Sequence, residues 1–112
     1  MGWFGGFTIE TYNRIPGDYE VVTVGTEAAV LSPGKIKPVS GPFARMTARA
    51  ALLSLEEGDI RFRIDGAAPT GGNGHYFSSG DVLIISGSQA LRQFQAVQAG
   101  EANGTLRVTY FY

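Results

Sequence analysis

In the stretch Ile60-Arg61-Phe62-Arg63-Ile64-Asp65-Gly66 every second residue is apolar, and Leu106-Arg107-Val108-Thr109-Tyr110 repeats the pattern near the end of the sequence. A period of two is typical of a β-strand with one face in the core and one in solvent. The apolar positions are therefore expected to be buried: Ile60, Phe62, Ile64, Leu106, Val108 and Tyr110. The arginines between them are expected at the surface or in an interface: Arg61, Arg63 and Arg107.

Further strands are indicated by short apolar runs between turn residues. The expected strands are 7–12, 19–24, 81–86, 94–97 and 106–112, with a turn at Asn13–Asp18 that contains Pro16-Gly17. Residues 46–55 fit a helix by propensity and a strand by pattern, and we interpret 43–64 as a β-hairpin. The run 81–86 is apolar throughout, which predicts a strand covered on both faces. One helical turn with Ser88 as N-cap is expected before 94–97, and Asn103-Gly104 predicts a second hairpin.

These elements predict an all-β fold with about seven or eight strands. Two long connections, the Pro/Gly-rich segment 31–42 and the loop 66–80, favour crossings between sheets over a simple meander. The expected fold is an antiparallel β-sandwich of Greek-key or jelly-roll type. It forms a single domain over residues 1–112, with residues 1–7 as an N-terminal arm.

The amino-acid composition limits the functions that the protein can have. Nine Lys and Arg residues nearly balance ten Asp and Glu residues, so the whole-chain charge gives no reason to expect nucleic acid or a membrane as partner. There is no cysteine, which excludes disulfides and thiolate sites and mildly favours a reducing compartment. No apolar stretch approaches the ~20 residues that span a bilayer.

No residue pattern points to an enzyme, a metal or another cofactor. His75 is the single histidine, whereas a cupin-type metal site needs several histidine and carboxylate ligands. Ser78, Ser79 and Asp81 follow His75 closely, but a catalytic triad is defined by geometry and not by proximity in a loop. We therefore expect His75 to be a structural loop residue and the protein to have no catalytic activity.

Two other segments have a superficial likeness to ligand sites. The glycine-rich stretch 71–74 lacks the Gly-Lys-Ser/Thr ending of a phosphate-binding loop and is expected to be a turn. Glu56, Glu57 and Asp59 lack the spacing of a calcium loop and are expected to form a solvated turn.

Residues 28–55 contain no acidic residue but several cations: Lys35, Lys37, Arg45 and Arg49. This local charge, in a segment rich in proline, fits a surface that docks on an acidic protein partner. Ordinary surface charge explains it equally well, and both interpretations stay open.

Aromatic residues stand at both ends of the sequence. Trp3, Phe4 and Phe7 lie among glycines and are expected to pack either on the sandwich itself or on a neighbouring subunit. Tyr110, Phe111 and Tyr112 put aromatic rings on both faces of the last strand, which is typical of a strand covered in an oligomer. We expect a homo-oligomer, with a trimer favoured.

The second half of the sequence resembles a family of small tailed-bacteriophage proteins encoded among the virion structural genes. The resemblance lies in the order and spacing of several short pieces: Ile60–Gly66, Pro69-Thr70, Gly74-His75, Gly80–Ile85, Phe94-Gln95-Ala96 and Leu106–Phe111. It implies a virion component without catalytic residues. Small β-sandwich proteins of this class decorate the capsid as cement, or are found at the neck or on tail fibres.

The sequence therefore predicts a non-enzymatic virion structural protein, with capsid decoration as the leading hypothesis. Its partner would be the major capsid protein or another virion protein. The predicted partner-binding residues are Trp3, Phe4, Phe7, Lys35, Lys37, Arg45 and Arg49. The alternatives are a neck or tail component, or a carbohydrate-binding sandwich that uses loop aromatics such as Tyr76 and Phe77.

Overall fold

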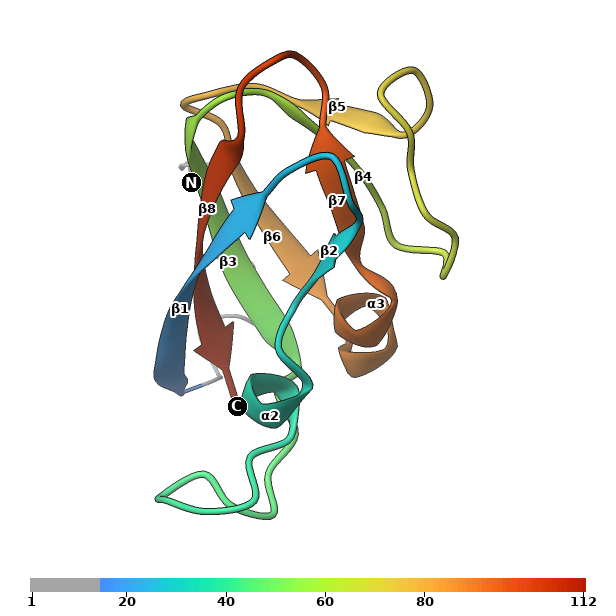
Figure 1. Ribbon diagram of the computed structural model, residues 1–112. Helices are drawn as coiled ribbons and strands as arrows, with labels where there is room; N and C mark the ends of the chain where they lie inside the picture. Colours follow the sequence, from blue (N-terminus) through green and yellow to red (C-terminus); the bar gives the residue numbers. More distant parts are fainter. Residues whose placement is uncertain (1–14) are drawn as a thin grey trace, which may run out of the picture.

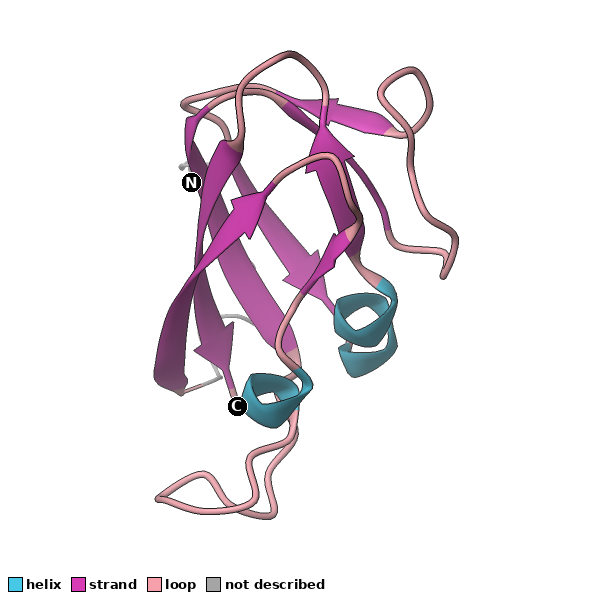
Figure 2. Cartoon of the chain, viewed as in Figure 1, coloured by secondary structure: helices cyan, strands magenta, loops and turns pink. Residues whose placement is uncertain are grey.

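The structure, a computed structural model, describes residues 15–112 and consists of eight strands and two short helices (Figures 1 and 2). The strands are β1 (Pro16–Val24), β2 (Ala29–Val30), β3 (Ala50–Glu57), β4 (Ile60–Arg63), β5 (His75–Phe77), β6 (Val82–Ser86), β7 (Gln95–Gln98) and β8 (Gly104–Phe111). The helices are α2 (Pro33–Ile36) and α3 (Ser88–Gln93). The predicted strand at 7–12 and the arm at 1–7 lie outside the described residues.

The strands form two antiparallel four-stranded sheets, in the orders β1-β8-β3-β6 and β2-β7-β4-β5. Only β4 and β5 are consecutive strands of one sheet; every other connection between neighbouring strands in the sequence crosses from one sheet to the other. This is the strand order of a jelly roll, in which an eight-stranded chain folds back on itself as two Greek keys. The predicted all-β sandwich is confirmed, with its jelly-roll topology.

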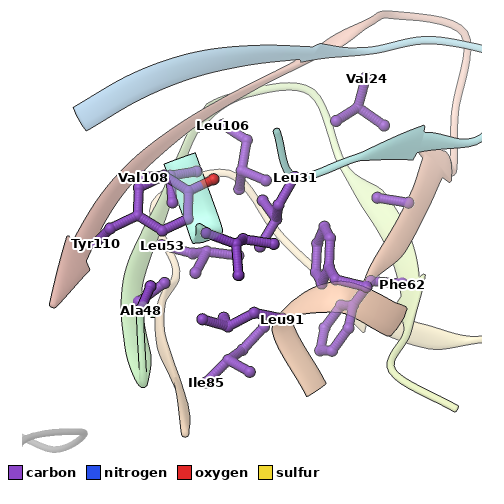
Figure 3. Packing of buried hydrophobic residues seen from close by; sticks show 14 of the residues in the cluster. Val24, Leu31, Ala48, Leu53, Phe62, Ile85, Leu91, Leu106, Val108 and Tyr110 are labelled. Carbon is purple, nitrogen blue, oxygen red and sulfur yellow. The ribbon is translucent and has the colours of Figure 1, made fainter. Parts of the chain in front are cut away.

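The core lies between the two sheets (Figure 3). Five of the six predicted core residues of the alternating stretches are buried, and Ile64 is the exception. The buried residues are Ile60, Phe62, Leu106, Val108 and Tyr110. The three intervening arginines are partly exposed, as predicted. Phe62 is surrounded by two rings from β5 and one from the α3–β7 junction, at centroid distances of 5.4 to 5.9 Å: His75, Phe77 and Phe94.

The prediction that Ile64 is buried is wrong, because this side chain is 39% exposed. Strand β4 ends at Arg63, one residue before the alternation in the sequence ends. The chain then leaves the sheet through Asp65, which pairs with Arg63, and Gly66, whose φ of 88° is a conformation that favours glycine. The alternating pattern therefore runs one residue beyond the strand.

Both predicted hairpins are wrong, because the paired runs lie in different sheets. Strand β3 pairs with β6 and β8, whereas β4 pairs with β5 and β7. The turn between β3 and β4 crosses the sandwich at Gly58, where φ is 70° and an added Cβ would lie 2.5 Å from the carbonyl oxygen of Asn103. Asn103 belongs to the β7–β8 turn, so the two crossings pack against each other.

Three smaller predictions need correction. Strand β6 lies at the edge of its sheet, with Val82 59% exposed, and is not covered on both faces. Pro16-Gly17 lies inside β1, next to an irregularity in its pairing with β8, and is not a turn. The helical turn after β6 exists as α3, but its N-cap is Gly87 without a side-chain cap, and not Ser88.

Candidate partner-binding surface at the cationic end

Helix α2, helix α3 and the segment 37–49 meet at one end of the sandwich, at the bottom of the view in Figure 1. The structure brings the predicted residues Lys35, Lys37, Arg45 and Arg49 to this end. It adds Arg92 of α3, which sequence analysis missed because it is far from the others in the sequence. We call these five residues and the surface they share the cationic end.

Lys35 has a different role from the rest of the cationic end. Its Nζ lies 3.2 Å from both carboxylate oxygens of Asp18, so it ties α2 to strand β1. The pKa of Asp18 lies below its ordinary value, chiefly because the carboxylate accepts a hydrogen bond from the Tyr19 amide and further because of Lys35. The charge of Lys35 is therefore largely used within the fold.

The other cations have no carboxylate within salt-bridge distance among the described residues: Lys37, Arg45, Arg49 and Arg92. Arg49 and Arg92 line an open hollow of about 620 Å³ together with the hydroxyl side chains of Thr47, Ser86 and Ser88. Guanidinium groups bind carboxylates through paired hydrogen bonds, so this hollow has the chemistry to receive an acidic side chain.

The backbone fixes Arg49 at the rim of the sandwich. Its amide donates to the carbonyl of Phe111 over 2.8 Å, and its carbonyl accepts from the amide of Gly87 over 2.7 Å. Arg49 therefore joins the end of β8 to the β6–α3 turn. Its side chain projects from a rigid point, which reduces the entropy lost when it binds a partner.

Residues 37–49 form a loop that projects from the cationic end, and we call it the docking loop. Val39 is 93% exposed, which leaves an apolar side chain almost wholly in water. Two tight turns shape the loop, with hydrogen bonds from the Ala44 amide to the Gly41 carbonyl and from the Met46 amide to the Phe43 carbonyl. Arg45 has a φ of 72°, a conformation that is unfavourable for a residue with a side chain.

The middle of the docking loop is held against the sandwich by an aromatic clamp. The ring of Phe43 stacks on Tyr112 at a centroid distance of 4.7 Å, and both rings pack over Gly17. The Tyr112 hydroxyl donates to the carbonyl of Lys35, and burial raises the pKa of Tyr112 to about 12. The Ala48 amide donates to the Ile36 carbonyl over 2.7 Å, which closes the base of the loop. The loop is thus anchored at its base and at its middle, and Val39 lies between these two anchors, exposed to solvent.

A second candidate surface contains the loop aromatics considered for carbohydrate binding. Tyr76 is 53% exposed, but Phe77 is buried in the core, so the two rings do not form a common platform. The guanidinium of Arg61 lies 5.2 Å from the centre of the Tyr76 ring, and the Tyr76 hydroxyl donates to Asp59 over 2.6 Å. These contacts already occupy one face and the polar group of the ring that a sugar would use.

The polar groups near His75 in the sequence form hydrogen bonds that stabilise turns. The Ser79 hydroxyl donates to the carbonyl of Glu56 over 2.6 Å, and the Asp81 carboxylate accepts from the Ser78 amide over 2.8 Å. Within residues 15–112 no hydrogen bond joins His75 to a serine or to a carboxylate. The same part of the chain contains no group of three residues placed to hold a metal ion.

The two segments that resemble ligand sites, 71–74 and 56–59, also form their polar contacts within the protein. Arg61 donates to the carbonyl oxygens of Gly71 and Gly74, so this glycine-rich turn presents carbonyls to a cation and not amides to a phosphate. Glu56 pairs with Arg107 at 2.7 Å, and Asp59 accepts hydrogen bonds from the Tyr76 hydroxyl and the Ser79 amide. Those hydrogen bonds lower the pKa of Asp59.

The aromatic residues at the chain ends give less support to an oligomer than the sequence indicated. Phe111 and Tyr112 are buried in a single copy, at 7% and 5% exposure, so no neighbouring subunit is needed to cover them. Trp3, Phe4 and Phe7 lie outside the described residues. The docking loop and the cationic end therefore remain as the described part of the predicted partner-binding surface.

Comparisons with protein-family models, with curated proteins and with solved structures found no match for this chain. Among the helices that the structure describes, none is long and apolar enough to cross a membrane.

Proposed function

We propose that this chain is a non-enzymatic structural protein of a bacteriophage virion, with capsid decoration as its leading role. In this proposal the cationic end docks on an acidic surface of a neighbouring subunit in the virion, and the arm at residues 1–7 contributes Trp3, Phe4 and Phe7 to the contact. The resemblance of the second half of the sequence to small phage structural proteins supports this assignment.

One observation carries the docking role: Val39 is exposed on a loop that Phe43 holds against the sandwich, at the end that carries four cations without a carboxylate partner among the described residues. One exposed valine has little effect on the stability of a monomer. Its burial under a partner stabilises the complex by roughly 1.5 kcal/mol or more. Residues of this kind, an apolar anchor with a cationic rim, are typical of the centre and border of protein interfaces.

The jelly-roll topology gives a second, weaker support. Eight-stranded jelly rolls occur in viral capsid proteins, lectins and cupins. Fold alone does not define function, but the surroundings of His75 and Tyr76 favour neither a cupin metal site nor a sugar platform. A capsid or neck role fits the features that remain.

The test uses particles that lack this protein. The full chain is added to them, and bound copies are counted by quantitative electrophoresis at increasing protein concentration. Val39→Asp and a chain without residues 1–7 should both bind much more weakly, while Val21→Asp, a matched change at a 47% exposed valine on β1, should bind normally. Full occupancy by both of the first two variants would contradict the proposal.

The same measurement separates the two positions in the virion. A decoration protein should saturate at a number of copies that scales with the capsid surface, whereas a neck component should saturate at the few copies of a single ring. If Val39→Asp loses binding but the occupancy is that of a ring, the docking surface stands and the role moves from the capsid to the neck.

A further inference from the structure

The end of the sandwich opposite the docking loop is acidic. It consists of the turns between β1 and β2, β3 and β4, β5 and β6, and β7 and β8, at the top of the view in Figure 1. These turns and the end of β3 that leads into them contain no lysine or arginine but several carboxylates: Glu27, Glu56, Glu57, Asp59, Asp81 and Glu101. We call this surface the acidic end.

The register of the strands shows that the two charged surfaces lie at opposite ends of the same sheet. Strand β8 begins at Gly104 opposite Val24, next to the acidic end, and it ends at Phe111 opposite Pro16 and Ala50, next to the cationic end. Its eight residues span about 26 Å at 3.3 Å per residue. The Debye length is about 8 Å at physiological ionic strength, so the two surfaces do not neutralise each other within one copy.

Part of the acidic end is free of intramolecular partners. Glu56 pairs with Arg107, and Asp59 and Asp81 accept hydrogen bonds within their turns. Glu27 and Glu101 form no hydrogen bond or salt bridge with another described residue. Two exposed carboxylates thus face solvent at one end, while Lys37, Arg45, Arg49 and Arg92 face it at the other.

We propose that copies of this chain associate head to tail, with the cationic end of one copy docked on the acidic end of the next. The inference rests on the proposed docking role of the cationic end and names its partner, which is a second copy. Val39 supplies an apolar anchor on one side, and Val82, 59% exposed at the start of β6 beside the acidic turns, supplies an apolar contact on the other.

Charge complementarity selects this arrangement over a two-fold symmetric dimer. Two cationic ends or two acidic ends brought together would repel, whereas the head-to-tail contact joins opposite charges. Unlike surfaces on each copy make the contact heterologous, and such contacts close into rings when the rotation between copies allows it. Because the two surfaces lie at opposite ends of one copy, successive copies would lie in line, so the contact favours an open chain over the closed trimer expected from the sequence.

The experiment measures the mass of the full chain in solution by analytical ultracentrifugation over a range of protein and salt concentrations. Val39→Asp disables the cationic end, and the double variant Glu27→Lys with Glu101→Lys disables the acidic end. Val21→Asp is the matched control, because it places the same charge on a valine of the β1 sheet face, away from both ends. A thermal melt of each variant verifies that it is folded.

The wild-type chain should form oligomers that dissociate as salt rises. Val39→Asp should associate at least about tenfold more weakly, as expected for the loss of one buried valine contact. The acidic-end variant should also associate more weakly, because its new lysines would face the cations of the next copy. Equimolar mixing of the two end variants should restore one intact contact and produce dimers that grow no further. This complementation is specific to a head-to-tail contact.

A wild-type chain that stays monomeric at low salt, or a mixture of the end variants that stays monomeric while the wild type associates, would overturn the inference. Dissociation by Val21→Asp and not by Val39→Asp would place the contact on the sheet face and overturn it as well. The proposed function is tested separately: a monomeric wild type whose binding to particles is lost in Val39→Asp would retain the docking role and reject only the self-association.

Discussion

Replacing Phe43 by Ala should release the docking loop at a moderate cost in stability. A fully buried Phe→Ala change costs roughly 3–5 kcal/mol, and Phe43 is only partly buried, so about half of that applies. The stack on Tyr112, with centroids 4.7 Å apart and planes inclined by 20°, adds part of the ~0.5–1.5 kcal/mol typical of aromatic pairs. We expect a loss of about 2 kcal/mol, since the core between the sheets is untouched.

The assay is urea unfolding followed by far-ultraviolet circular dichroism, in parallel with the sedimentation measurement. Phe43→Ala should lower the midpoint and weaken association, because a loop without its clamp must be ordered upon binding. Val39→Ser should leave the midpoint unchanged, since Val39 is 93% exposed, while it too weakens association. Gly17→Ala should mimic Phe43→Ala, because its Cβ would lie 2.7 Å from both rings. Unchanged midpoints for Phe43→Ala and Gly17→Ala would refute the clamp.

Three further outcomes follow from the fold. Phe62→Ala should cost roughly 3–5 kcal/mol, because its ring fills the core, and an unchanged thermal melt would remove Phe62 from the core. Gly58→Ala should destabilise far more than Gly41→Ala in urea unfolding; both have positive φ and incur about 1 kcal/mol for it, but only at Gly58 would the Cβ meet backbone, at 2.5 Å. The lowered pKa of Asp18 means that its pairing stabilises the fold above about pH 4 and that this contribution is lost as pH falls; Asp18→Asn should flatten the acid limb of a stability–pH curve, and an unaltered limb would exclude the effect.

Six of the eight described strands could be located from the sequence, but the short strands β2 and β5 were missed and the pairing of the strands could not be predicted. Alternation located β4 and β8 because each has one dry and one wet face, and their buried residues were identified correctly up to Ile64. The pairing was predicted from turns, and short polar turns such as 56–59 are equally compatible with a hairpin and with a crossing between sheets. The only residue in this turn with a backbone conformation that favours glycine is Gly58, with a φ of 70°. Glycine is common in turns of both kinds, so it does not distinguish a hairpin from a crossing between sheets.

The candidate site shows the same division. The absence of acidic residues from 28–55 located four of the five cations of the cationic end, but Arg92 comes from a helix between two other strands and no local pattern connects it to them. The internal pairing of Lys35 with Asp18 was equally invisible, because the two residues meet only through the packing of α2 on β1. A charged surface formed by neighbouring residues in the sequence could be predicted. A charge that the fold adds from a distant segment, or neutralises in an internal ion pair, could not.

The topology explains why the charge of a nearly neutral chain is divided between its two ends. In a jelly roll the connections alternate from one end of the sandwich to the other, so the turns after β1, β3, β5 and β7 gather at one end. Those turns and the adjoining end of β3 carry six of the ten acidic residues, and the connections after β2 and β6 carry five of the nine lysines and arginines. Acidic and cationic connections that alternate along the sequence are therefore separated at the two ends of the sandwich. A chain with a net charge of −1 at pH 7 acquires two opposite surfaces, and only a second molecule can bring them into contact.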